Sequence, residues 1–252
     1  MVPRETQMMF QLIAHLNGNV YRIYQLDGYR MYLNVSESIM MAWRACGNYE
    51  PHKHQLMKNT LRPGMTFIDV GANKGDFTLL AASRVGPQGR VLAFEPHPDN
   101  TYWLRQSIAL NRFTNITLVE AALSNSNGRE NLFEGSGSGQ HSLLKQADGQ
   151  RAWCVNTYRL DDYLAAEGID QMDAIKIDVE GAEWQVLEGA RGTLQRCKPV
   201  VYLDVHQLPR QQYAEIFALF HGLGYTISHS SSPMEILTTL PETAADLFLR
   251  MR

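Results

Sequence analysis

The sequence predicts an α/β fold in which a mainly parallel sheet is covered by helices on both faces. From Met65 onward, short apolar runs alternate with longer segments whose apolar residues have helical spacing. Such alternation is typical of strand–helix–strand units, and the parallel sheets that they build are buried on both faces. Hydrophobic residues make up 44% of the 252 residues, which is enough to bury a sizeable core.

A small cap of helix and strand is expected before this alternation, in residues 1–60. A first helix is predicted within residues 5–16. Two aromatic-rich runs in "VYRIYQLDGYRMYLN" flank Asp27-Gly28, a dipeptide that strongly favours a hairpin. Another helix is predicted to begin near Pro51 and to end before Pro63-Gly64, since proline favours a first helical turn. The main domain is then residues 61–252.

The first half of the main domain reads as three strands and two helices. The predicted strands are "TFIDV", "RVLAFEP" and "ITLVEAAL", and the helices between them are "DFTLLAASRV" and "PDNTYWLRQSIALN". The alternation then fails between Asn125 and Val155, where Gly, Ser and Gln are abundant. Residues 134–150 of this stretch are expected to be either a flexible loop or a mobile lid over a substrate. A histidine within it, His141, is either solvated or able to enter a site on closure.

The second half resumes the alternation and ends in an antiparallel pair. Its predicted helices are "LDDYLAAEG", "EWQVLEGARGTL" and "PRQQYAEIFALFHGLG", and its parallel strands are "DAIKIDVE" and "PVVYLDVH". The closing strands are "YTISHS" and "MEILTTL".

Bulk composition narrows the functional classes. The net charge of −3 gives no broad basic surface for nucleic acid. The three scattered cysteines have no metal-type spacing and favour a reducing compartment. No apolar run reaches the roughly 18 residues that cross a membrane, so a soluble cytoplasmic protein is expected. A peripheral membrane helix at residues 5–16 is kept as an alternative to an ordinary packing helix.

The turn "GANKGDFT" follows the first parallel strand, where ligands bind in open α/β sheets. Its glycines, Gly71 and Gly75, are spaced GxxxG, which does not fit the GxGxxG dinucleotide fingerprint. Lys74 is followed by Gly75-Asp76, so the turn is not a P-loop either. Asp69 places a carboxylate at the mouth of the turn, which would repel phosphate and suits an ammonium group.

A second acid, Glu95, ends the next strand within "AFEP". An acid at this position accepts hydrogen bonds from ribose hydroxyls. A GxxxG turn between Asp69 and Glu95 therefore fits S-adenosylmethionine, which has a nucleoside and a charged amino acid end but no phosphate. The alternative is purely structural, with Asp69 as a helix cap and Glu95 as a solvated strand end.

These residues resemble the FkbM-type S-adenosylmethionine-dependent methyltransferases from about residue 48 to residue 206. The matching pieces are "NYEP", "FIDVGANKGDFTLLAA", "GRVLAFEPHPDN", "NITLVEAALS", "RLDDYL", "AIKIDVEGAEWQVLEGA" and "YLDVH", of which "KIDVEGAE" is the most specific. The resemblance implies a Rossmann-like class I methyltransferase fold with a seven-stranded sheet. It also implies methylation of hydroxyl groups in natural products and sugars.

The resemblance assigns a cofactor role to residues at several strand ends. Asp69, Gly71, Asn73 and Gly75 would surround the amino acid part, and Glu95, flanked by Pro96 and His97, would hold the ribose. Ala121 and Ala122 would lie beside the adenine, where many methyltransferases carry an aspartate. Asp178 would stand where the methyl group is presented, and Glu50 of "YEP" would close over the cofactor.

The catalytic candidates end the fourth and fifth strands: Asp178 and Glu180, then Asp204 and His206. Adjacent parallel strands would bring these pairs together. His206 is the first choice as general base because the pKa of a histidine is near neutrality. Asp178 could orient a substrate, and Glu180 could equally cap the next helix. Asp178, Glu180 and Asp204 are also expected to be the ligands if Mg²⁺ binds.

The leading hypothesis is an O-methyltransferase that acts on a small molecule, sugar or natural product. The alternatives are an N-methyltransferase, a nucleic acid methyltransferase and a catalytically silent S-adenosylmethionine-binding module. A nucleic acid enzyme that methylates exocyclic amines would carry an Asn-Pro-Pro-Tyr-like set where this chain reads "DVEG". His52 and His54 are expected at the surface, and homo-oligomerisation is left open.

Overall fold

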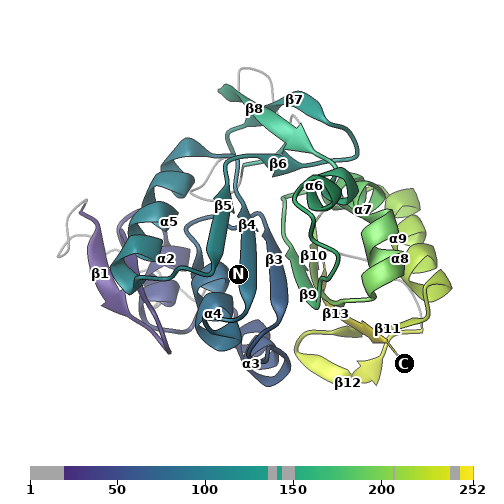
Figure 1. The fold of residues 1–252 in the computed structure, drawn as a ribbon, viewed down its shortest axis with the longest axis horizontal. Coiled ribbons are helices and arrows are strands. Elements are labelled where there is room, and N and C mark those ends of the chain that lie inside the picture. The colour runs from purple at the N-terminus through teal and green to yellow at the C-terminus, as the bar shows by residue number, and fades with distance from the viewer. Residues whose placement is uncertain (1–19, 136–140, 144–150, 207, 239–244, 252) are drawn as a thin grey trace.

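The computed structural model describes residues 20–135, 141–143, 151–206, 208–238 and 245–251 (Figure 1). The helix predicted within residues 5–16 lies outside the described residues. So does most of the segment 134–150, which was predicted to be a loop.

The main sheet has eight strands in the order β12-β11-β13-β10-β9-β3-β4-β5. Five neighbouring strands, β5 to β10 in this order, are parallel, whereas β13 is antiparallel to both of its neighbours. The mainly parallel seven-stranded sheet is thus confirmed, with β12 as an eighth strand at one edge. The strands are β3 (Thr66–Val70), β4 (Arg90–Phe94), β5 (Ile116–Val119), β9 (Ala174–Ile177), β10 (Val200–Val205), β11 (Tyr225–His229), β12 (Ser232–Ile236) and β13 (Ala245–Met251).

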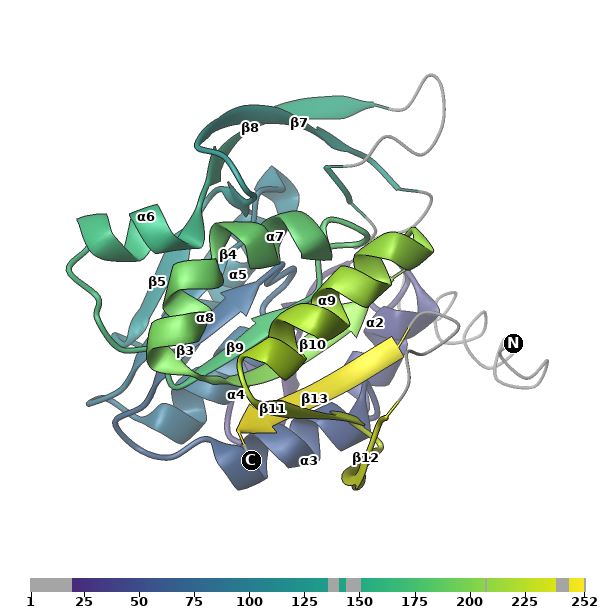
Figure 2. The ribbon, with the colours of Figure 1, turned by 90° about the vertical axis from the view of Figure 1, so that its right-hand side faces the viewer.

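Helices cover both faces of this sheet (Figures 1 and 2). Successive residues of β3 show why: Phe67 enters the core on one face and Ile68 enters the core on the other. The helices on the Phe67 face are α3 (Pro51–Thr60), α4 (Asp76–Val85) and α5 (Pro98–Asn111). Those on the Ile68 face are α6 (Leu160–Ala166), α7 (Glu183–Gly189), α8 (Arg191–Cys197) and α9 (Arg210–Gly222). The single helix expected after the fourth strand is therefore two, α7 and α8, which meet at Ala190.

The N-terminal segment forms the predicted hairpin and one helix that was not predicted. Strands β1 (Arg22–Gln25) and β2 (Arg30–Leu33) pair antiparallel across a turn in which Gly28 has a φ of 91°. Helix α2 (Ile39–Ala45) begins at Ser38, whose side chain accepts a hydrogen bond from the Met41 backbone N–H. Met31, Met41 and Met57 are fully buried in the core that contains α4. This segment therefore packs against the Phe67 face of the sheet.

The stretch between Asn125 and Val155, where the alternation fails, contains strands that were not predicted, and they flank the segment 134–150. Strands β6 (Ala122–Leu123), β7 (Gly128–Phe133) and β8 (Ala152–Tyr158) form a separate sheet in the order β6-β8-β7. The predicted strand "ITLVEAAL" is accordingly divided between β5 of the main sheet and β6 of this one. A bridge between Phe133 and Ser142 brings residues 141–143 back against β7. Figures 1 and 2 both place this small sheet above the main one.

The C-terminal strands also differ from the prediction. The predicted antiparallel pairing of "YTISHS" with "MEILTTL" is confirmed as the pair β11 and β12. The sequence prediction missed β13, which is inserted between β10 and β11. Among the helices that the structure describes, none is long and apolar enough to span a membrane.

Candidate active site

A cavity lies where β3, β4 and β9 end, the edge at which open α/β sheets bind their ligands. The turn after β3 supplies Gly71 and Asn73 to its wall, and the end of β4 supplies Glu95 and Pro96. Three other parts of the chain complete the wall. Their residues are Arg44 and Tyr49 from the N-terminal segment, Asp178 and Glu180 after β9, and Ala122, Leu132 and His141 from the small sheet and its bridge.

Gly71 is the glycine of the turn that faces the cavity. It has a φ of 76°, and a Cβ on it would lie 1.9 Å from the carbonyl oxygen of Asp178. Only glycine therefore lets the turn approach the end of β9. Gly75 has a φ of 93°, but its missing Cβ makes room for the Leu104 side chain, 2.2 Å away. The structure thus separates the two predicted cofactor-binding glycines, one at the cavity and one in the packing of α5.

Asp69 lies beneath the turn rather than in the cavity wall. Its side chain is fully buried and accepts a hydrogen bond from the Thr78 hydroxyl. Burial raises the pKa of Asp69, and the neighbouring Lys176 partly offsets that rise. Asp69 can therefore affect a bound molecule only through the groups around it.

Lys176 was missed by the sequence reasoning, although it interrupts the apolar strand "AIKI". Its Nζ lies 3.5 Å from Asp69 Oδ1 and 3.4 Å from Asp178 Oδ2, and donates a hydrogen bond of 3.0 Å to the Gly71 carbonyl. Burial opposes its charge, but the carboxylates of Asp178 and Asp69 outweigh this and raise the pKa of Lys176. One buried ammonium therefore joins the ends of β3 and β9, and Lys176 is itself part of the cavity lining.

Glu95 is held in place by three donors at the end of β4. Its carboxylate accepts the backbone N–H groups of Asn73, at 2.7 Å, and His97, at 2.9 Å, and the side-chain amide of Asn100 at 3.2 Å. Only 4% of Glu95 is exposed, and burial raises its pKa. The structure therefore presents an immobilised acid to the cavity where a ribose-binding acid was predicted.

His97 does not line the cavity, whereas His141 does. The two rings stack with centroids 4.0 Å apart, and the edge of Trp153 contacts His97 at 4.5 Å. Burial and the neighbouring His97 together lower the pKa of His141 to about 4, so its ring is neutral at physiological pH. His141 is thus placed in the wall rather than in solvent. Of the two predicted alanines, Ala122 lines the cavity and Ala121 is buried behind it.

His206 lies among three carboxylates. Its Nδ1 is 2.7 Å from Glu183 Oε1, and its Nε2 is 3.7 Å from Asp178 Oδ1 and 3.5 Å from Glu180 Oε2. Burial opposes the charged ring, but the hydrogen bond to Glu183 and the charges of Asp178 and Glu180 raise the pKa of His206 to about 9. The predicted general base therefore already carries a proton at neutral pH. Glu183, buried in the first turn of α7, was not predicted as a partner.

Glu180 has a backbone conformation that is unusual for a residue with a side chain. Its φ is 54°, and the Ser142 hydroxyl donates a hydrogen bond of 2.7 Å to its carbonyl. Burial raises the pKa of its carboxyl group, and the charge of His206 partly offsets this. Glu180 lines the cavity and is not the cap of α7, for which no side-chain hydrogen bond is found.

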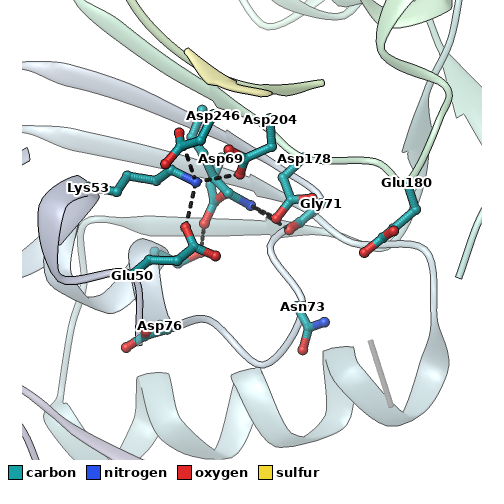
Figure 3. A network of polar contacts seen from close by, with 12 residues as sticks. Glu50, Lys53, Asp69, Gly71, Asn73, Asp76, Asp178, Glu180, Asp204 and Asp246 are labelled. Carbon is teal, nitrogen blue, oxygen red and sulfur yellow. Dashed lines mark hydrogen bonds and ion pairs between the residues drawn. The ribbon is translucent and has the colours of Figure 1, made fainter. Parts of the chain in front are cut away.

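Asp204 and Glu50 are directed away from the other candidates and toward Lys53 (Figure 3). Lys53 comes from α3, is 1% exposed, and also lies 3.5 Å from Asp246 Oδ1. Burial opposes its charge, but the carboxylates of Asp204, Glu50 and Asp246 raise the pKa of Lys53 well above its ordinary value. Asp204 is thus already used as an ion-pair partner.

The predicted Mg²⁺ set of Asp178, Glu180 and Asp204 is divided between two clusters. Asp178 and Glu180 lie with His206, whereas Asp204 lies with Glu50 and Asp246 around Lys53. His54 was predicted at the surface, but its side chain is half-buried. Its Nε2 lies 3.3 Å from Asp76 Oδ2, and its ring contacts Phe77.

The chain is similar in sequence to known methyltransferases. The family model for the methyltransferase FkbM domain matches residues 69–227. The 2-O-methyltransferase NoeI of Sinorhizobium fredii is 27% identical over 161 residues, which are 57% of this chain and 65% of NoeI. The 31-O-demethyl-FK506 methyltransferase FkbM of Streptomyces tacrolimicus is 28% identical over 215 residues, or 73% of this chain and 82% of that protein.

A solved structure supports the fold. The crystal structure of a Clostridium thermocellum protein to which rRNA-methylase activity is ascribed superimposes with a TM-score of 0.51 at 10% identity, covering 79% of this chain and 93% of that one. The likeness concerns the arrangement of helices and strands alone.

Proposed function

Because this chain belongs to the FkbM methyltransferase family, we propose that it is an S-adenosylmethionine-dependent enzyme that methylates a hydroxyl group of a small molecule. The first relative described above is named as a 2-O-methyltransferase, and the second as a methyltransferase of 31-O-demethyl-FK506. The observation that carries the proposal is one cavity lined by Glu95, Gly71 and Asp178 at adjacent strand ends. Nothing in this set favours a phosphate, and every polar group in it suits a nucleoside or an amino acid.

The residues around the cavity fit this cofactor. Glu95 is a fixed carboxylate able to accept hydrogen bonds from ribose hydroxyls, and Gly71 leaves space that a Cβ would fill. Asp178 keeps its negative charge despite burial, because Lys176 lowers its pKa, and it would attract an ammonium group. When bound, S-adenosylmethionine supplies a methyl carbon attached to a positive sulfonium.

We propose Glu180 as the group that takes the proton from the acceptor hydroxyl. It lines the cavity, and its raised pKa makes it a better base than an ordinary exposed carboxylate. His206, predicted as the base, would instead hold the negative charges of Asp178 and Glu180 in place while it is protonated. Asp204 has no part in this scheme because Lys53 occupies it.

The acceptor would enter between the N-terminal segment and the small sheet. Both supply wall residues, among them Tyr49, Leu132 and His141. Such a mixed aromatic and apolar wall suits a small organic molecule. The net charge of −3 lends no support to a nucleic acid acceptor. The three cysteines are free thiols, which supports the cytoplasm as the proposed location.

We also propose a Mg²⁺ site whose ligands differ from the predicted set. Asp178, Glu180 and His206 each offer one ligand atom, all within 4.8 Å of one another. A divalent ion there would compete with the proton on His206. Activity that is lost in EDTA and restored by Mg²⁺ would support it, and activity unchanged in EDTA would reject it.

Titration calorimetry with S-adenosylhomocysteine tests the function itself. We expect saturable binding to the wild-type protein and about tenfold weaker binding to Glu95→Gln, since that variant has lost a charge-assisted acceptor. Absence of binding at millimolar ligand would refute the proposal. With an acceptor in hand, Glu180→Gln should lower kcat by about 10²- to 10⁴-fold without changing cofactor affinity. An equal loss in His206→Gln and none in Glu180→Gln would return the base role to His206.

A further inference from the structure

Arg44 is a buried cation in the cavity wall, and the proposed function assigns it no role. It lies in the last turn of α2, and only 8% of it is exposed. It shares the wall with Tyr49, Asn73 and Asp178. A charged guanidinium is costly to bury unless its donors are used. The hydrogen-bond partners of Arg44 therefore decide whether its burial is compensated.

The contacts of Arg44 leave most of its hydrogen-bonding capacity unused. Its guanidinium lies 3.9 Å from the centroid of the Tyr49 ring, and one terminal nitrogen donates to the Met41 sulfur at 3.6 Å. Its Nε is 3.9 Å from Asp76 Oδ2, too far for a hydrogen bond, and has no acceptor among the described residues. Asp76 already accepts a hydrogen bond from Tyr29 and pairs with His54.

The other buried cations near the cavity differ from Arg44 in this respect. Lys176 lies between the carboxylates of Asp69 and Asp178 and donates to a carbonyl. Lys53 faces the carboxylates of Glu50, Asp204 and Asp246. Arg44 is the described cation of the wall whose donors reach no carboxylate oxygen at hydrogen-bond distance. A planar guanidinium with free donors is suited to two parallel hydrogen bonds with a carboxylate.

We propose that Arg44 binds a carboxylate group in this cavity, namely the carboxylate at the amino acid end of the cofactor. The inference rests on the proposed function. The cavity wall carries several carboxylates, among them Asp178, and two cations, Lys176 and Arg44. Lys176 already faces the carboxylates of Asp69 and Asp178, which leaves Arg44 as the available positive group. An amino acid end has the complementary pair, an ammonium and a carboxylate. The stacking on Tyr49 fixes the plane of the guanidinium before any ligand arrives, which lowers the entropy cost of binding.

The test compares two ligands that differ only in this group, S-adenosylmethionine and decarboxylated S-adenosylmethionine. Their dissociation constants are measured by calorimetry, without an acceptor, for wild type, Arg44→Met and Arg44→Lys. Methionine keeps the apolar stem of the side chain. Arg84→Met, at an exposed arginine in the last turn of α4, is the matched control. Thermal melts establish that each variant is folded.

We expect Arg44→Met to weaken S-adenosylmethionine binding by about 10- to 100-fold, the range for lost hydrogen bonds to a charged group. Binding of the decarboxylated ligand should change less than about threefold on the same reasoning. Arg44→Lys should lie between, and Arg84→Met should match wild type. Equal weakening of both ligands would overturn the proposal and leave Arg44 a structural role.

Two further results distinguish a failure of the Arg44 assignment from a failure of the proposed function. If the wild-type protein binds neither ligand, the proposed function itself fails. If both bind and Arg44→Met alters neither, the function stands and the assignment of Arg44 is refuted. In that case a raised KM for an acidic acceptor in Arg44→Met would show that the carboxylate belongs to the acceptor.

Discussion

Replacing Lys176 with methionine tests the buried charge network at the cavity. Lys176 is 2% exposed and Asp69 is fully buried. The substitution removes the only ammonium within hydrogen-bonding or ion-pairing distance of Asp69 among the described residues. Asp178, which is 21% exposed, keeps His206 as a neighbour at 3.7 Å. The loss therefore falls mainly on Asp69.

The magnitude follows from the distances. At an effective dielectric constant of about 20, one ion pair at 3.5 Å is worth about 5 kcal/mol before desolvation. Desolvation of the lysine offsets part of this, but a buried carboxylate left without its partner typically costs about 3–5 kcal/mol of folding free energy. We therefore expect Lys176→Met to lose about 3–5 kcal/mol above neutral pH.

The loss should depend on pH in a definite direction. The folded-state pKa of Asp69 is already raised, so this group stabilises the fold at low pH and ceases to do so as the pH rises through that value. Without Lys176 the pKa rises further. Asp69 then binds a proton more readily at low pH, whereas at high pH it must stay charged and unpaired or bind a proton at a cost. The destabilisation should therefore be larger at pH 8 than at pH 5.

Urea unfolding followed by tryptophan fluorescence, at both pH values, measures this loss. Lys58→Met is the control, because it removes a surface ion pair with the exposed Asp27 and should cost no more than about 1 kcal/mol. Adding Asp69→Asn to Lys176→Met should restore part of the loss, because no unpaired carboxylate then remains at position 69. A loss below about 1 kcal/mol, or one that does not change with pH, would refute the reasoning.

Three further predictions concern the cavity. Gly71→Ala should abolish cofactor binding in calorimetry, because its Cβ would lie 1.9 Å from the Asp178 carbonyl oxygen. The control Gly47→Ala, at a glycine with a φ of 70° and open space around it, should reduce stability alone. Cofactor binding by Gly71→Ala would contradict this prediction. His206 has a pKa raised to about 9, so its stabilisation is complete below about pH 6.5 and is lost as the pH rises through 9. His206→Gln should therefore flatten the decline of the urea midpoint between pH 7 and pH 9.5, and an unchanged slope would count against it. His141→Ala should weaken binding of both S-adenosylmethionine and its decarboxylated form about equally, by a few-fold, because its neutral ring lines the cavity; selective loss of one ligand would be inconsistent with that role.

Features set by local pattern were predicted from the sequence. The helix "PDNTYWLRQSIALN" coincides with α5, and β3, β4, β9 and β10 lie where apolar runs end in an acid or a turn. Helix α2 was missed because its seven residues are too short to show a helical period. The small sheet was missed because β7 alternates polar and apolar residues weakly and follows a loop-like composition.

The site was predicted only as far as backbone positions determine it. Gly71, Glu95 and Asp178 line the cavity because strand ends of a parallel sheet meet at one edge. Which cation each acid would pair with could not be read from the sequence, since the partners lie far apart along the chain. Asp204 is an example: its position beside Asp178 was predicted, but its carboxylate forms an ion pair with Lys53, which is 151 residues away along the chain.

That separation in sequence has a consequence for how the protein is made. Lys53 is synthesised early, whereas two of its three acids belong to β10 and β13, near the end of the described chain. During translation, Lys53 has only Glu50 of these acids as a partner until β10 and β13 have been synthesised. The ligand-binding edge therefore assembles late, and a nascent chain stalled before β13 should remain open to proteases at α3 even after the parallel strands have formed.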